Sequence, residues 1–258
     1  MDAVGLGAAY AVALVLAMPL LVRFGQRLGR RQLKHDADGS RAGITAVEGV
    51  VFGLLGLMIA FTFSGALRRF DDRRELVTRE ANAISGAWLR LDLLPEPAQP
   101  PLRAMLRDYL DARIQLYEHL LEKDVAAAAR SRATALQGEL WKASMAAWRE
   151  AGSPLPAALL FPALNDMFDI ATTRWGTLQI HPPLIVYLML GALLMAVGLL
   201  IGYDLAGTRA WHWGHILGFS ILMAFTFYVI IDLEYPRQGI WRVTSSDTLL
   251  LELRETMK

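Results

Sequence analysis

The sequence predicts an all-α integral membrane protein with four transmembrane helices and an extramembrane helical bundle inserted between the second and third spans. Hydrophobic residues make up 54% of the 258 residues and charged residues 20%. Such a composition is expected where apolar and charged segments are separated along the chain. Four apolar runs reach the roughly 20 residues needed to cross a hydrocarbon core. These runs are Ala3–Val22, Ile44–Leu67, Pro183–Tyr203 and Trp213–Ile231.

Residues 1–67 form the expected first transmembrane hairpin. We expect its first run to stay in the mature protein as a span, because Met1 and Asp2 offer no basic leader and the run ends in Arg23 rather than at a small-residue cleavage site. A basic linker at residues 23–43 joins the two spans, and we interpret it as a polar loop or a short interfacial helix. Its charged residues are Arg23, Arg27, Arg30, Arg31, Lys34 and Arg41 against Asp36 and Asp38.

Residues 68–182 are predicted to form the helical extramembrane domain. The second span should continue as helix to about Leu94, because apolar residues keep a helical rhythm beyond the membrane. Asn82 interrupts this rhythm, and we expect it to hydrogen-bond across the bundle. The apolar stripe consists of Leu76, Ala83, Ile84, Ala87 and Leu91.

Prolines and a glycine then divide the rest of the domain. Pro95, Pro97, Pro100 and Pro101 should end the long helix, since proline lacks the amide donor and restrains the residue before it. Apolar residues recur at nearly 3.5-residue spacing from Leu102 to Trp148, which predicts a long helical segment that packs on a neighbour. A further helix from about Ala157 to Gln179 follows Gly152. The second transmembrane hairpin then occupies residues 183–232 and a C-terminal tail residues 233–258.

The basic residues leave the orientation of the domain open. The short basic linker favours the cytoplasm, which would place the domain on the opposite side of the membrane. The far end of the second span also carries a basic cluster, which favours the cytoplasm for the domain equally. That cluster is Arg68, Arg69, Arg73, Arg74 and Arg79.

Small residues draw a strip down one face of the second span at Gly49, Gly53, Gly56, Ala60 and Ser64. Such strips let membrane helices approach closely, so one interpretation is tight packing within a subunit. The other is a pore-lining span, in which the strip meets a neighbouring helix and a hydrophobic constriction gates by dewetting. The gate candidates are Phe52, Ile59 and Phe63, and the candidate vestibule charges are Glu48, Arg68 and Arg69.

No pattern in the sequence predicts an enzyme. There is no phosphate-binding glycine loop, no nucleophile with a base and no cysteine, so we expect neither a catalytic residue nor a cofactor. His212 and His215 have the spacing of two metal ligands on a helix, yet no third ligand lies nearby and we expect no metal site. The net charge of +1 does not favour a nucleic-acid partner.

Several segments together resemble a bacterial membrane family with a distant likeness to the bestrophin anion channels. The likeness covers nearly the whole chain, and calcium gating is not implied, because the acidic calcium clasp of the animal proteins has no counterpart here. The segments are Phe61-Thr-Phe-Ser-Gly-Ala-Leu-Arg-Arg-Phe-Asp-Asp-Arg-Arg-Glu, Glu80-Ala-Asn-Ala-Ile, Leu91-Asp-Leu-Leu-Pro-Glu-Pro and Asp232…Tyr235-Pro-Arg-Gln-Gly…Val243-Thr-Ser.

The resemblance implies five protomers around one pore, with the second span of each lining a hydrophobic neck at Phe52, Ile59 and Phe63 and the helical domain on the cytosolic side. We therefore expect a homo-oligomeric ion channel of the bacterial inner membrane that favours inorganic anions. The alternative is a non-conducting signalling or scaffold protein whose helical domain binds a partner.

Overall fold

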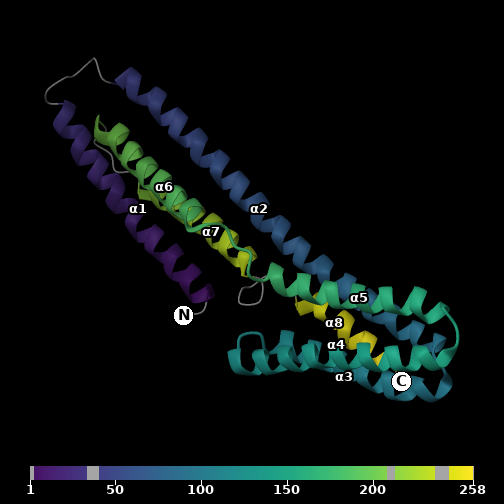
Figure 1. Cartoon of the computed structure of the whole chain (residues 1–258). Coiled ribbons are helices and arrows are strands. Elements are labelled where there is room, and N and C mark those ends of the chain that lie inside the picture. The colour runs from purple at the N-terminus through teal and green to yellow at the C-terminus, as the bar shows by residue number, and fades with distance from the viewer. Residues whose placement is uncertain (1–2, 34–40, 208–212, 236–243, 258) are drawn as a thin grey trace. The chain divides into compact units, whose positions relative to one another are not determined.

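The structure is a computed structural model that describes residues 3–33, 41–207, 213–235 and 244–257. The described residues form α-helices and short 3₁₀ turns without a strand (Figure 1), which confirms the predicted all-α class. The chain divides into two compact units. Unit 1 comprises residues 1–70 and 181–242, and unit 2 comprises residues 71–180 and 243–258.

Among the described residues, four helices are long and apolar enough to cross a membrane, as predicted, and their apolar runs belong to unit 1. They are α1 (Ala3–Leu33), the first part of α2 (Arg41–Arg90), α6 (Leu184–Asp204) and α7 (Trp213–Glu234). Helix α1 runs well beyond the predicted end of the first span, so the first part of the basic linker is helical. Arginine, leucine and glutamine have high helix propensity, and cations stabilise a helix C-terminus.

Helices α1 and α6 approach each other through glycine. A Cβ atom at Gly25 would collide with the carbonyl oxygen of Leu199, and one at Gly202 with the carbonyl oxygen of Val22. Gln26 adds a hydrogen bond from its Nε2 to the Leu205 carbonyl oxygen, 3.2 Å away. The sequence interpretation overlooked these glycines because they are divided between two distant segments. Gly29 and Gly198 add to this close approach, because a Cβ atom at Gly29 would also meet the Tyr203 carbonyl oxygen and one at Gly198 would crowd Met18.

Helix α2 packs on unit 1 in a different way, through large side chains. Leu55 is buried in a cluster with residues of α1, α6 and α7, and Ile59 packs against the same cluster. In the described part of unit 1, α1 lies close to both α6 and α7, whereas the backbone of α2 makes no comparable approach to another helix. The buried members of the cluster are Met18, Leu55, Leu190, Leu194, Val197 and Phe227.

Unit 2 is a helical bundle built from the second part of α2, α3 (Gln99–Glu118), α4 (Lys123–Ala151), α5 (Leu155–Thr177) and α8 (Thr244–Thr256), with 3₁₀ turns η1 (Leu91–Leu93) and η2 (Glu96–Ala98). Helix α2 was predicted to continue to about Leu94 and ends at Arg90, after which η1 extends the turn to Leu93, just before the prolines. Gly152 lies beyond the end of α4 in the left-handed conformation, with φ 62°, which glycine adopts without strain.

The long helical segment predicted from Leu102 to Trp148 is wrong, because a turn divides it between α3 and α4. The turn contains neither glycine nor proline. Leu120 within it packs against Leu116 and Ala126, so the apolar repeat continues across the turn and hides it. The C-terminal tail also contains a helix, α8, whose Arg254 pairs with Asp111 of α3 at 2.6 Å.

A buried carboxylate joins three helices of unit 2. Glu80 of α2 accepts from Nε of Arg113 on α3 at 2.5 Å and from a terminal nitrogen of Arg174 on α5 at 2.7 Å. All three side chains are almost completely buried, and the Arg174 guanidinium lies 3.5 Å from the ring centroid of Tyr117. The expected cross-bundle bond of Asn82 is not observed, because Asn82 is exposed and Glu80 occupies the interior instead.

The two arginines keep Glu80 ionised. Burial by itself would raise the pKa of the Glu80 carboxyl, but the nearby guanidinium groups of Arg113 and Arg174 and their hydrogen bonds outweigh it, so the pKa lies below its usual range. A charged carboxylate balances part of the buried positive charge, and removing one member of such a group leaves the others uncompensated.

Replacing Glu80 with glutamine should destabilise unit 2 by about 3–5 kcal/mol, because two buried guanidinium groups lose their counterion. Thermal unfolding in detergent, followed by tryptophan fluorescence, measures the change. Glu75→Gln is the matched control, since Glu75 is exposed and pairs only loosely with Arg79 at 3.9 Å, and its effect should stay within about 0.5 kcal/mol. Equal melting of the two variants would contradict the role assigned to Glu80.

Candidate functional site

The small-residue strip of α2 is exposed along its whole length in the protomer: Gly49, Gly53, Gly56, Ala60 and Ser64 are all solvent-accessible. A Cβ atom added at any of the three glycines would meet nothing within 4 Å. The expected packing of the strip within a subunit is therefore not observed among the described residues. Packing of the strip against a second copy stays a prediction.

The three gate candidates lie beside the strip on α2, each one residue before a strip position and thus about 100° around the helix from it. Phe52 is 37% and Phe63 38% exposed, so each projects partly out of the protomer. Ile59 is half-buried and packs against two apolar clusters of unit 1. Phe52 also meets the ring of Phe219 on α7 edge-on, with the centroids 6.5 Å apart. Phe63 can reach a space outside the protomer, whereas Phe52 and Ile59 also contact other helices of unit 1.

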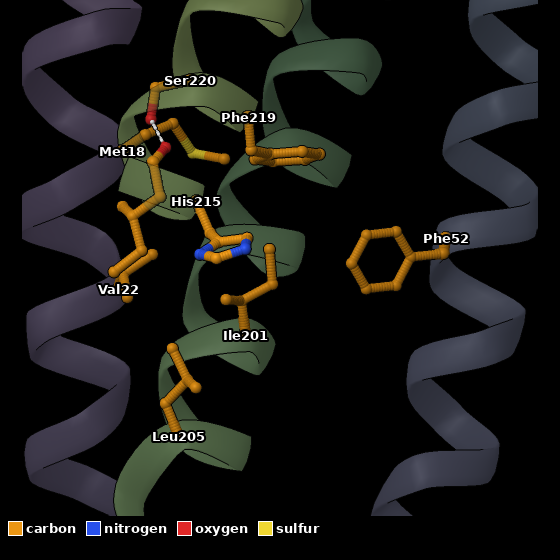
Figure 2. A pocket seen from close by; sticks show the side chains of 9 residues that line it. Met18, Val22, Phe52, Ile201, Leu205, His215, Phe219 and Ser220 are labelled. Atoms are coloured by element: carbon orange, nitrogen blue, oxygen red, sulfur yellow. Dashed lines mark hydrogen bonds between the residues drawn. The ribbon is translucent and has the colours of Figure 1, made fainter. Parts of the chain in front are cut away.

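A pocket of about 520 Å³ lies beside Phe52, where α1, α2, α6 and α7 meet. Figure 2 shows the Phe52 ring projecting from α2 towards the side of the pocket that carries Phe219 and His215 of α7 and Ile201 of α6. The Ser220 hydroxyl donates to the carbonyl oxygen of Ile216 at 2.7 Å (Figure 2), so its polarity is satisfied within α7. The remaining lining residues, Met18, Val22, Leu205 and Ile216, are apolar.

A polar cluster joins the other ends of α2 and α7. Arg69 donates to both carboxylate oxygens of Glu234, with a shortest N–O distance of 2.8 Å. His181 lies 3.1 Å from the same carboxylate and stacks on Tyr235 with ring centroids 4.7 Å apart. The Glu234 side chain is fully buried, so this bidentate pair fixes the end of the α2 span to the end of the α7 span.

The other candidate charges flank the spans. Glu48 is half-buried near the start of α2. Its carboxylate and that of Asp204, at the end of α6, are close enough to repel each other. Arg68 is exposed, whereas Arg69 belongs to the cluster with Glu234. Arg237 and Arg242, the basic residues that follow Glu234 in the sequence, lie outside the described ranges, as does His212 of the candidate metal pair.

Comparison with known proteins identifies the family. The model of the bestrophin-like domain matches residues 12–248. The chain belongs to the bestrophin-like family. Solved structures agree with this assignment at the level of the fold. A bacterial bestrophin homolog from Klebsiella pneumoniae aligns with 95% of this chain and 98% of its own, at a TM-score of 0.64 and 16% identity.

Two further structures give the same result. A mutant of the Klebsiella pneumoniae bestrophin homolog reaches a TM-score of 0.68 over 96% of this chain and 98% of its own, at 14% identity. A mutant described as a membrane protein reaches a TM-score of 0.68 over 95% of this chain and 98% of its own, at 16% identity. No curated protein matches this chain. The bestrophin-like fold therefore extends over nearly the whole chain, and with its four apolar helices the chain is a membrane protein.

Two polar groups of this bestrophin-like protein escaped the sequence interpretation. His181 directly precedes the two prolines before α6, and Arg113 stands at a position of the apolar repeat in α3. Both pair with acids more than thirty residues away in sequence. A basic residue at an apolar repeat position is the one local signal that pointed to Arg113, since a buried cation requires a counterion.

Two glycine substitutions should separate packing within the protomer from packing between copies. Gly202→Ala should destabilise the protomer by about 1–3 kcal/mol, because the new methyl group meets the backbone of α1 and cannot be relieved by a side-chain rotation. Gly53→Leu should leave the protomer folded, because its position is open, while weakening any oligomer that uses the strip. Melting temperature measures the first effect and size-exclusion chromatography with light scattering the second.

Two results for the Gly53→Leu variant would contradict a contact of the strip with a second copy. If Gly53→Leu unfolds the protomer, the strip has a partner within the subunit and the assignment fails. If Gly53→Leu changes neither stability nor oligomeric state, the strip faces lipid.

Proposed function

We propose that this protein is a homo-oligomeric ion channel of the bacterial inner membrane that favours inorganic anions, with the permeation path along the membrane part of α2. Phe52, Ile59 and Phe63 form its hydrophobic neck. Five subunits are the number favoured by the likeness to bestrophin channels. The observation that carries the proposal is the uncovered face of α2, which no described helix of its own protomer packs against closely.

An uncovered apolar face with a small-residue strip suits a helix that meets another copy of itself. Small residues allow close approach between membrane helices, and subunits arranged in a closed ring use the same pair of surfaces at every interface. With the strip facing a neighbour, the adjacent edge that carries Phe52 and Phe63 can turn towards the axis. Rings of apolar side chains at such a constriction can gate conduction by dewetting.

An exposed arginine at one end of the membrane part of α2 supports anions over cations. Arg68 is exposed directly after the apolar run of α2, so a ring of copies would present a ring of cations, which favours anions at a pore mouth. Arg69 is held beside it by Glu234 at 2.8 Å, so its charge is partly neutralised. We therefore assign the larger part of the selectivity at this mouth to Arg68.

Purified protein in planar lipid bilayers should pass current. Phe63→Ala should raise the conductance or the open probability, because a smaller apolar side chain widens the constriction and lets it hydrate. Leu188→Ala is the control and should leave the current unchanged, since Leu188 is also an exposed apolar residue but belongs to α6. Single-channel recording measures both variants.

A salt gradient tests selectivity in the same bilayers. The reversal potential should lie close to the equilibrium potential of the anion. Arg68→Gln should move the reversal potential towards zero, because it weakens the preference for anions. Silence at both polarities over a range of pH would contradict a channel and favour the scaffold alternative. A reversal potential close to the equilibrium potential of the cation would contradict the preference for anions but not the channel itself.

A further inference from the structure

The pocket beside Phe52 lies where the apolar runs of α6 and α7 meet their shared end, which is the expected membrane boundary. Leu205 directly follows the end of α6, and His215 is in the first turn of α7. Trp213, at the start of α7, is 49% exposed, the placement typical of interfacial tryptophan. An apolar cavity of this size at this depth is in the range that encloses a small ligand, and it opens where the acyl chains of lipids meet their headgroups.

The rim of the pocket carries positive charge. The guanidinium of Arg23 lies 4.9 Å from the ring centroid of Trp213, next in sequence to the lining residue Val22. Arg27, one turn further along α1, is exposed, and this part of α1 runs beside the end of α6, since Gln26 bonds the Leu205 carbonyl oxygen. Cations at interfacial depth with apolar space beneath them suit a phosphate headgroup above an acyl chain.

Acidic residues at this end are fewer than basic ones in the described part of the chain. Glu48 and Asp204 interact with each other electrostatically and are the acids of α2 and α6 at this boundary. The exposed cations of α1 are Arg23, Arg27, Arg30 and Arg31. The balance is therefore positive, which complements an anionic phosphodiester more than a zwitterionic one.

We propose that the pocket of α1, α2, α6 and α7 binds one anionic phospholipid per subunit, with an acyl chain among Met18, Ile201 and Phe219 and the phosphate held at the rim by Arg23. Phe52 of α2 forms one wall of this pocket (Figure 2), so the bound chain lies directly behind the helix that carries the proposed ion path. The binding site itself does not depend on conduction.

Native mass spectrometry of the delipidated full-length protein tests the site, with phosphatidylglycerol and phosphatidylcholine of identical acyl chains as probes. The wild-type protein should bind one phosphatidylglycerol per subunit saturably and phosphatidylcholine more weakly. Arg23→Gln should weaken phosphatidylglycerol binding roughly five-fold, the effect of one interfacial cation, and leave phosphatidylcholine binding unchanged. Arg31→Gln is the matched control and should behave as wild type, because it lies about 12 Å further along α1.

A second variant fills the cavity. Ile201→Trp places a larger ring where Ile201 now lines the pocket and should reduce the binding of both lipids, with the melting temperature and oligomeric state retained. Equal binding of the two lipids to wild type, or normal phosphatidylglycerol binding to Arg23→Gln, would overturn the proposal. Loss of the oligomer in Ile201→Trp with unchanged lipid binding would also overturn it, because a second copy would then occupy the pocket.

Discussion

The close approach of α1 and α6 is the interaction on which the membrane unit depends. Gly25 and Gly202 bring the two backbones together so tightly that neither position can hold a Cβ atom. Helix α7 packs on α1 as well, so three of the four apolar helices are closely associated. Helix α2 remains outside this group and contacts it through large side chains such as Leu55 and Ile59. Its glycines Gly49, Gly53 and Gly56 therefore face outward and do not contact another helix of the protomer.

This division gives the glycines of the chain two different roles. Gly25 and Gly202 permit the close packing of α1 on α6, whereas Gly49, Gly53 and Gly56 have no neighbour within 4 Å of an added Cβ atom. Glycine lowers helix stability relative to alanine even where it is tolerated, so three glycines on an exposed face are unfavourable for an isolated subunit. Contact with another copy offers a physical reason for these three glycines. The pair of Arg69 with Glu234 holds α2 to α7 at the other end of the span.

The sequence predicted the helices better than the contacts between them. Four spans and the extension of α2 to Arg90 followed from apolar run length and from the prolines after Leu94. The turn between α3 and α4 was missed, because Leu120 maintains the apolar rhythm through it. The buried Glu80 cluster and the α1–α6 glycines were missed for a common reason. Each depends on partners brought together from distant segments, which no local pattern of residues reveals.

The central claim is that the uncovered face of α2 meets other copies of the chain around a shared axis. Electron cryomicroscopy of the protein in lipid nanodiscs tests it most directly, because the map shows subunit number and the position of each span at once. The account predicts a closed ring in which the membrane part of α2 lies nearest the symmetry axis and borders a continuous passage. A monomer, or an oligomer in which the strip from Gly49 to Ser64 faces lipid at the periphery, would contradict it.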